Sequence, residues 1–392
     1  MKILLLSSAP AVSGTRTGGS IIWCQSFVRM LRKRGHEVFL VTYGEKYSPD
    51  ECPEFKNITA FGSYDRTRLA WIDPVLFKHI PGMIKTSKVV SDITRKKNID
   101  IVVTSNIHEA GCLFFSKITC PIITICHGYY PYELRNWNDG RRRWPRLTAY
   151  WLLEQCGARR AVNIVCPSHW LKERLTERLP HHQGIKVIHN MLGERPVMRH
   201  GYSRKALSLR ENTPLIVSYN IMTAPFNSEA LAIYLNSVKK VAMINDQIQF
   251  LLFGVNDSAM KFVLQSARGL PITILGKVDN VFEVLELADI FLHVSLADTF
   301  SMTTLEAMSL GLPVIVTDLG ALRERVGDNE NGLVVDLDPG KISEAVITLV
   351  NNPNKGKVLG GNAAMSSADY REDKIAKQWE EFLIQTIEKG AF

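Results

Sequence analysis

Long apolar runs are missing from this 392-residue sequence. No stretch approaches the roughly 18–20 uninterrupted apolar residues that would span a bilayer. The start, Lys2 followed by Ile3–Leu6, imitates a signal peptide only faintly, because its apolar core is about four residues against the seven or more that a signal needs. We therefore expect a buried first strand there, and neither a membrane span nor a leader.

Cysteine pairing is missing as well. The seven cysteines are an odd number, no CxxC occurs, and none lies beyond Cys166. A disulfide framework or a zinc site needs pairing or ligand spacing, so the pattern predicts reduced, mostly buried thiols of a cytosolic protein. HExxH and grouped His/Cys/Asp are also absent, which excludes the common metalloenzyme signatures.

Acidic charge is scarce in one half of the chain. Residues 1–200 carry 30 Lys and Arg against 16 Asp and Glu, a balance of +14, whereas residues 201–392 carry 17 against 23, a balance of −6. Charge this lopsided suggests an anionic partner for the first half only. Nucleic acid is a poor candidate, because no recognised nucleic-acid-binding motif is present.

Short apolar, β-rich runs recur along the chain with helical segments between them, the pattern of parallel α/β units. In the first half they are 2–7, 38–43, 101–104, 122–126, 163–166 and 186–189, and in the second 214–218, 249–253, 272–275, 289–294, 313–317 and 333–335. Two sets of about six predict two doubly wound, Rossmann-like domains. We expect the domains to be 1–197 and 198–370, with a C-terminal helix in 371–392 that packs back toward the first.

The first expected strand leads into a glycine-containing loop, 13–20, and then a helix from about residue 21 to 34. Gly18 and Gly19 would let the backbone approach a ligand, and the helix N-terminus with Ser20 offers N–H groups to phosphate. A flexible turn and cap explains the same residues. The loop is not GxGxxG and no ribose-binding acid follows, so a nicotinamide site is poorly supported.

The most informative stretch runs from Asp298 to Ile315, DTFSMTTLEAMSLGLPVI. The pattern predicts a strand, a loop with Asp298 at the carboxyl edge of the sheet, and a short helix that carries Glu306. Carboxylates beside sugar hydroxyls and free N–H groups beside phosphate suit a nucleotide-sugar. We expect those N–H groups on Ser301, Met302 and Thr303. The alternative is a capping box at Thr303 to Glu306, which would explain Glu306 without any ligand.

The spacing Asp298-x7-Glu306 resembles the signature of retaining family 4 (group 1) glycosyltransferases of the GT-B fold. Other segments are similar to that family's motifs in the right order, over about residues 1–350. They are Gly18-Gly19, the GHEV at 35–38, His127-Gly128, the CPS at 166–168 with LKERL at 171–175, the IHN at 188–190 and the NGL at 331–333.

The resemblance implies roles for the matched residues. Glu306 would bind the donor ribose, Asp298 a hydroxyl of the transferred sugar, and the backbone at Ser301, Met302 and Thr303 the diphosphate. His127 would lie near the donor sugar from the opposite domain, although backbone hydrogen bonds alone explain such a strand-end histidine. Gly18, Gly19 and Ser20 would close on the donor diphosphate or the acceptor.

Two departures from the family pattern matter. The first acid is Asp298 where the family usually has Glu, one methylene longer. The family's Arg and Lys, which neutralise the diphosphate, are missing after the strand at 214–218. Ser218, Tyr219 and Asn220 occupy the first place and Asn227-Ser228 the second, with no basic residue from 211 to 238. Another cation, helix dipoles or backbone amides must then hold the leaving group, or donor binding is impaired.

Arg and Trp alternate in the basic half. The segment 135–146 contains Arg141, Arg142, Arg143 and Trp144, and 78–97 adds further lysines among apolar residues. Arg with Trp suits an anionic membrane surface or an acceptor surface, although such patches also occur as ordinary solvated faces. The DxD at Asp336 to Asp338 precedes Pro339-Gly340, which favours a turn over a metal site.

These observations predict a retaining, metal-independent glycosyltransferase with an interdomain cleft. It would move a sugar from a nucleotide-diphosphate donor, its co-substrate, to a saccharide or lipid-linked acceptor in surface polysaccharide or glycan biosynthesis. It would need no cofactor, bind no nucleic acid, and sit in the cytoplasm, peripheral at the inner face of the membrane. The alternatives are a nucleotide-sugar epimerase or hydrolase of the same fold, and a non-catalytic sugar-nucleotide binder.

Overall fold

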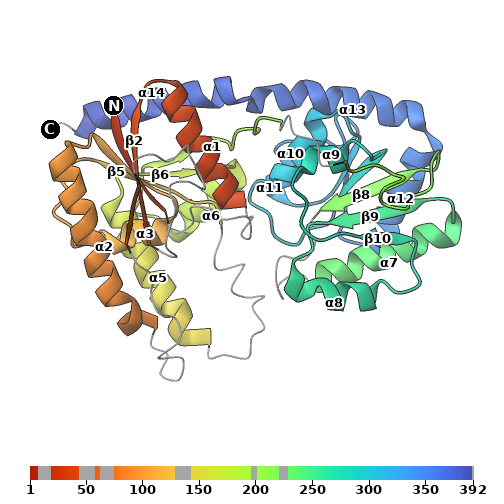
Figure 1. Ribbon diagram of the computed structural model, residues 1–392, viewed down its shortest axis with the longest axis horizontal. Helices are drawn as coiled ribbons and strands as arrows, with labels where there is room; N and C mark the ends of the chain where they lie inside the picture. Colours follow the sequence, from red (N-terminus) through yellow and green to blue (C-terminus); the bar gives the residue numbers. More distant parts are fainter. Residues whose placement is uncertain are drawn as a thin grey trace. The chain divides into compact units, whose positions relative to one another are not determined.

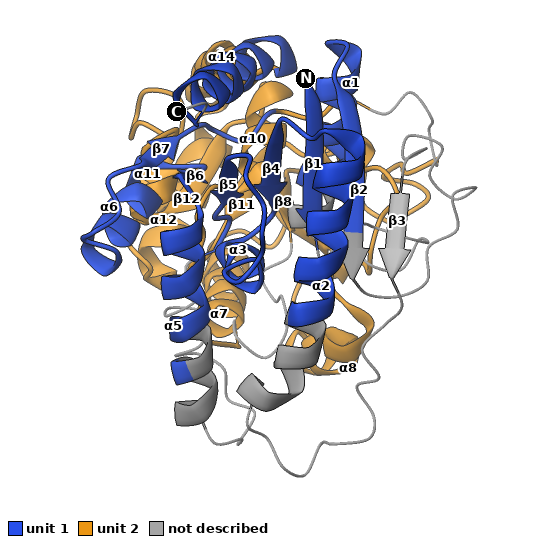
Figure 2. Ribbon diagram, turned by 90° about the vertical axis from the view of Figure 1, so that its left-hand side faces the viewer, with its two compact units in different colours: residues 1–129, 141–191, 372–392 blue, residues 130–140, 192–371 orange. Residues whose placement is uncertain are grey.

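The computed structural model describes residues 1–7, 19–43, 58–61, 75–128, 143–195, 201–219 and 228–390. The chain divides into two compact units. Of the described residues, unit 1 contains those from 1 to 128, 143–191 and 372–390, and unit 2 contains 192–371 (Figure 2). None of the described helices is long and apolar enough to cross a membrane.

Unit 1 is built on a parallel sheet, part of which Figure 1 labels. The strand order is β3-β2-β1-β4-β5-β6-β7. The strands are β1 (Lys2–Ser7), β2 (Glu37–Tyr43), β3 (Ile58–Phe61), β4 (Ile101–Thr104), β5 (Ile122–Ile125), β6 (Asn163–Cys166) and β7 (Ile185–Val187). The helices are α1 (Gly19–Lys33), α2 (Val75–Lys97), α3 (Ile107–Cys112), α5 (Arg143–Arg160), α6 (His169–Arg178) and α14 (Glu372–Gly390).

Unit 2 is built on a second parallel sheet in the order β10-β9-β8-β11-β12-β13. Its strands are β8 (Leu215–Tyr219), β9 (Gln249–Phe253), β10 (Ile272–Ile274), β11 (Ile290–His293), β12 (Val314–Thr317) and β13 (Leu333–Val335). Its helices are α7 (Ser228–Ile244), α8 (Asp257–Ser266), α9 (Val281–Leu285), α10 (Met302–Ser309), α11 (Gly320–Arg323), α12 (Pro339–Asn351), α13 (Pro353–Ser367) and the 3-10 turn η3 (Ala368–Tyr370).

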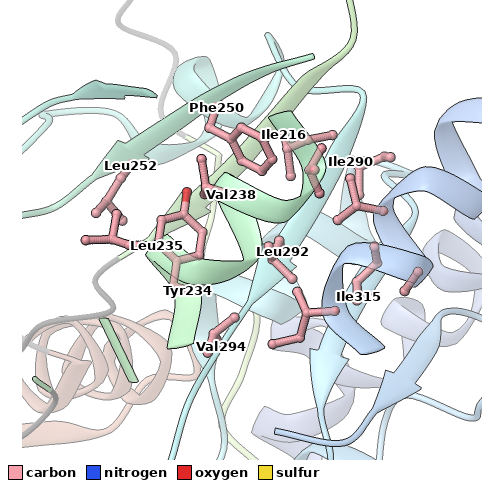
Figure 3. Packing of buried hydrophobic residues seen from close by; sticks show 14 of the residues in the cluster. Ile216, Tyr234, Leu235, Val238, Phe250, Leu252, Ile290, Leu292, Val294 and Ile315 are labelled. Carbon is pink, nitrogen blue, oxygen red and sulfur yellow. The ribbon is translucent and has the colours of Figure 1, made fainter. Parts of the chain in front are cut away.

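Both sheets are buried on both faces, as the unbroken apolar strands predict. In β1, Ile3 and Leu5 pack into one core cluster while Leu4 and Leu6 pack into another on the opposite face. In unit 2, Tyr234 of α7 packs on one face of the sheet, among the apolar side chains that Figure 3 labels. The two doubly wound α/β sheets confirm the predicted fold class.

The strand predictions were correct to within one or two residues at each end, with one strand missed. β3 was not predicted, because its four residues, ITAF, follow a polar stretch without a clear period. The tail predicted as a separate C-terminal helix is α14, and its Ile375, Trp379 and Leu383 are buried in the core of unit 1 with residues of α1.

Gly360 of α13 packs against the turn that follows α10 in unit 2. A Cβ added to Gly360 would lie 2.0 Å from the carbonyl oxygen of Gly311, whereas one added to the next residue, Gly361, meets nothing within 4 Å. Gly311 itself has a φ of +74°, so that the chain can turn after α10. Since the obstructing atom belongs to the backbone, α13 and the turn at Gly311 must separate to admit any side chain at 360.

We predict that Gly360→Ala destabilises unit 2 by about 1–3 kcal/mol through overpacking. Gly361→Ala is the matched control in the same helix, and it should stabilise by up to about 1 kcal/mol because alanine has the higher helix propensity. Calorimetric melting of the two variants measures the difference. Equal melting temperatures would show that α13 moves away from Gly311 without cost.

Candidate functional site

The site in unit 2 begins where the strand order reverses. β8 lies between β9 and β11. The chain continues from β8 to β9 and β10 on one side of the sheet, and from β11 to β12 and β13 on the other. Open α/β sheets bind ligands at the carboxyl ends of such strands. Here β8 ends at Tyr219 and β11 ends at His293. These two residues mark the carboxyl ends of the strands, and the predicted donor-binding residues from Ser301 to Glu306 come after β11 in the sequence.

Asp298 organises the loop between β11 and α10. One carboxylate oxygen lies 3.1 Å from Nε2 of His293, and the other accepts the backbone N–H groups of Phe300 (2.9 Å) and Ser301 (2.6 Å). The side chain is still 20% exposed. Asp298 therefore lies at the predicted sheet edge, and its carboxylate already fixes the loop around it.

The pKa of Asp298 reflects this network. Burial alone raises the pKa of the carboxyl, but the hydrogen bond and charge of His293 act against burial. The N–H of Phe300 and the charge of Arg325 lower it further, so that the pKa lies below its ordinary value. The carboxyl is therefore a stable anion at neutral pH.

Ser301 caps α10 in a left-handed conformation, with φ at +52°. Its hydroxyl lies 2.8 Å from that of Thr304, and its own N–H is bound to Asp298. In this structure Asp298 therefore accepts the Ser301 N–H, and contact of this N–H with a ligand stays a prediction. The N–H groups of Met302 and Thr303, the first two of the helix, donate to no described residue and are the ones left for an anion.

Glu306 takes no part in capping. The cap residue is Ser301 and the third helical residue is Thr304, so the capping box proposed for Thr303 and Glu306 is wrong. Within the described residues the Glu306 carboxylate accepts no hydrogen bond and forms no ion pair. Burial raises its pKa to about 8. The side chain is half-buried, and a carboxylate with a raised pKa and no hydrogen-bond partner among the described residues favours a role toward a ligand.

Tyr219, the last residue of β8, lies close enough to Glu306 to feel its charge. The Tyr219 ring packs on the backbone of Gly254, so closely that a Cβ added to Gly254 would lie 2.4 Å from the ring. The centroid of the Tyr219 ring lies 4.8 Å from that of Phe253. Burial raises the pKa of the Tyr219 phenol to about 12, with a smaller contribution from the negative charge of Glu306. Sequence reasoning placed Tyr219 only as a residue that replaces the missing arginine.

Arg325 is the residue that sequence reasoning missed. It follows α11, is only 5% exposed, and donates from Nη2 to the Ser301 carbonyl at 3.3 Å. Its guanidinium carbon lies 3.9 Å from the centroid of the Phe300 ring. A charged residue in a short run such as Arg323-Glu324-Arg325 gives no sequence signal of burial, so only the fold reveals it.

His127 belongs to unit 1 and lies two residues after the end of β5. Burial lowers the pKa of its imidazole to about 4, so the ring is neutral at neutral pH. Its ring meets Trp23 edge-on at 4.7 Å between centroids, and Trp23 stacks on Phe27 at 4.6 Å. Phe27 in turn contacts Trp379 of α14 at 4.9 Å. The histidine predicted from sequence thus rests on an aromatic cluster of α1 and α14.

Other predicted residues are described in part or lie outside the described ranges. Gly19 and Ser20 begin α1, which agrees with a helix N-terminus after the glycine loop. Arg143 and Trp144 begin the backbone of α5. Gly18, Asn220, Arg141 and Arg142 lie outside the described residues.

The DxD of the second half forms a turn and a cap. Asp338 caps α12, and its carboxylate accepts the N–H groups of Gly340 (2.8 Å) and Lys341 (2.9 Å), while Asp336 is exposed. This agrees with the turn expected from the sequence. Over the part of the chain that the structure describes, no three His, Cys, Asp or Glu side chains group as metal ligands.

We predict that Asp298→Asn lowers the stability of unit 2 at neutral pH by about 1–3 kcal/mol, because charge-assisted hydrogen bonds become neutral ones. The pKa of Asp298 is lower in the folded state, so this stability is present above the ordinary carboxyl pKa and is lost as pH falls through the folded value. The difference in melting temperature between the wild type and Asp298→Asn should therefore stay constant from pH 8 to about 5 and become smaller below about pH 4. Asp336→Asn is the exposed control, and a difference that grew in acid would contradict the network.

Two family models match the chain, Glycosyltransferase Family 4 over residues 17–192 and Glycosyl transferases group 1 over 214–352. N-acetyl-alpha-D-glucosaminyl L-malate synthase of Bacillus anthracis is 24% identical over 93% of both chains. A Campylobacter jejuni N-acetylgalactosaminyltransferase, named for a diphospho-undecaprenol substrate, is 26% identical over 36% of this chain and 38% of its own. The structure of HepE from Anabaena with UDP and glucose superposes with a TM-score of 0.73 at 16% identity, over 98% of this chain and 100% of that one. The two sheets, the order of motifs and these matches agree: the chain belongs to the group 1 glycosyltransferases of the GT-B fold.

Proposed function

We propose that the protein transfers a sugar, with retention of anomeric configuration, from a nucleotide-diphosphate-sugar to a lipid-linked saccharide acceptor in surface polysaccharide or glycan biosynthesis. The observation that carries this proposal is Glu306, a half-buried carboxylate one turn into α10 whose pKa is raised by burial and which has no hydrogen-bond partner among the described residues. The diphospho-undecaprenol in the name of the Campylobacter jejuni relative supports a lipid-linked acceptor, and the malate in the name of the Bacillus anthracis relative provides the soluble alternative to test.

In this proposal, different residues of unit 2 bind different parts of the donor. Glu306 accepts hydrogen bonds from the ribose hydroxyls, and Asp298 holds a hydroxyl of the transferred sugar with the lone pairs that the loop leaves open. The N–H groups of Met302 and Thr303 bind the diphosphate. Neutral His127 is assigned to the donor sugar, because an imidazole without charge both donates and accepts.

The chemical step exchanges one oxygen on the anomeric carbon for another. The bond from that carbon to the diphosphate oxygen breaks, and the acceptor oxygen bonds on the same face while the sugar carries oxocarbenium-like charge. The acceptor proton leaves with the diphosphate. Hydrogen bonds that strengthen as negative charge develops on the leaving diphosphate lower the barrier.

We predict that Glu306→Gln weakens donor binding by about 1.5–3 kcal/mol, roughly 10- to 150-fold, while the protein stays folded. Titration calorimetry against UDP-, GDP- and ADP-sugars measures this, with exposed Glu344→Gln as the control. Since the free carboxyl has its pKa at about 8 and the ribose hydroxyls need the carboxylate, wild-type affinity should rise from pH 6 to about 8 and then level off. Unchanged donor affinity in the variant, or affinity that falls with pH in the wild type, would contradict the role of Glu306.

We propose that the reaction needs no metal ion or other cofactor, because helix N–H groups are assigned to the diphosphate. Transfer should therefore persist after dialysis against EDTA at its original rate. Loss of activity in EDTA that manganese or magnesium restores would contradict this assignment and return attention to Asp336 and Asp338.

We also propose that the protein is cytoplasmic and binds the inner face of the membrane through the basic first half of the chain. The exposed Trp151 and Leu152 on α5, 47% and 37% exposed, support the proposal, because α5 begins with Arg143 and Trp144 of the basic segment. Each basic side chain near an anionic surface contributes about 1 kcal/mol.

We predict that the protein sediments with vesicles containing phosphatidylglycerol, is released as salt rises, and ignores neutral vesicles. Replacing Arg141, Arg142 and Arg143 by Ser should weaken this binding without changing donor affinity. Replacing the exposed Lys205, Lys239 and Lys240 by Ser is the charge-matched control. Equal binding to neutral and anionic vesicles, or binding to neither, would leave the basic face merely solvated and favour a soluble acceptor.

A further inference from the structure

The donor site of unit 2 lacks a basic side chain where the family places one. The sequence has no Lys or Arg from 211 to 238, and β8 ends in the uncharged Ser218 and Tyr219. The N–H groups of Met302 and Thr303 alone carry only the partial positive charge of a helix end. A donor diphosphate brings at least two negative charges, so a full positive charge is needed nearby.

Arg325 is a full positive charge buried directly behind this helix end. Its Nη2 donates to the carbonyl of Ser301, the residue that caps α10. The guanidinium lies on the ring of Phe300, which precedes that cap. Nε and Nη1 are buried and form no hydrogen bond with any described residue. An arginine that served only to hold the fold together would be expected to have its buried donors satisfied.

We propose that Arg325 replaces the missing basic pair: its charge, acting through the Ser301 cap, makes the N-terminus of α10 a diphosphate site. The proposal rests on the function proposed above. Arg325 is a positioning and electrostatic residue and touches no substrate, because the Ser301 peptide lies between it and the first N–H groups of the helix.

The physical basis is the low polarity around the guanidinium. Arginine stays protonated even when buried, and a buried charge is screened by salt far less than an exposed one. By donating to the Ser301 carbonyl, Arg325 also offsets the negative end of the peptide dipole nearest the helix start. Asp298, Glu324 and Tyr370 are the other ionisable groups that influence it, and the Asp298 charge is already shared with His293 and two N–H groups.

The test separates charge on the diphosphate from the shape of the whole site. Binding of the nucleoside diphosphates UDP, GDP and ADP is compared with binding of the nucleosides uridine, guanosine and adenosine. Each nucleoside is titrated as a competitor of the diphosphate that the protein binds. Arg325→Gln keeps one donor for Ser301 but removes the charge, and Arg325→Lys keeps the charge but loses the planar contact with Phe300. Arg323→Gln is the control two residues away, where the arginine is exposed and paired with Asp318.

We expect Arg325→Gln to weaken the nucleoside diphosphate about tenfold, equal to 1.4 kcal/mol, and the nucleoside by less than about twofold. Arg325→Lys should stay within about threefold of the wild type for both, and Arg323→Gln should change neither. If Arg325→Gln does not fold, Arg325→Met, with an apolar side chain of similar length, makes the same comparison.

Equal losses for nucleoside and nucleoside diphosphate would overturn the proposal, because Arg325 would then act through the shape of the loop. A lysine variant as impaired as the glutamine variant would overturn it too. Wild-type protein that binds none of the three diphosphates would instead contradict the proposed function itself and remove the basis for this inference.

Discussion

The hydrogen bonds to the Asp298 carboxylate are the constraint on which the proposed donor site of unit 2 depends. They tie His293, at the end of a buried strand, to the backbone that starts α10, so the helix begins at a fixed place on the sheet edge. Everything proposed for the donor follows from where that helix begins: its two open N–H groups, Glu306 one turn later, and the carbonyl that Arg325 holds. The acid therefore acts first as a structural anchor.

Much of the fold could be predicted from sequence because parallel strands buried on both faces are unbroken apolar runs, visible without any partner. The short strand β3 could not, since four residues beside a polar stretch carry too little pattern. The helix α10 and the place of Glu306 one turn into it could be predicted, whereas the alternative of a capping box at Thr303 to Glu306 is wrong. Thr303 with Glu306 fits a capping box by sequence, and only the left-handed Ser301, whose N–H is bound to Asp298, shows that the cap lies two residues earlier.

Arg325 shows a different limit of sequence reasoning. Residues 323 and 325 are both arginine, two positions apart, yet one is exposed in an ion pair and the other is buried on an aromatic ring. No local pattern distinguishes them, because the difference lies in what the turn after α11 packs against. The stretch in which the family has its basic residues contains none here. The fold instead places Arg325, about a hundred residues further along the chain, behind the start of α10.

The place of α14 bears on how the chain folds as it is made. Ile375, Trp379 and Leu383 complete the hydrophobic core that β1 and α1 begin, and Trp379 lies in the aromatic cluster beneath His127. The ribosome therefore finishes unit 2 before it has supplied the last part of unit 1. The first unit must wait with an open apolar surface while the second is synthesised, so the order of synthesis and the order of completion are reversed in this protein.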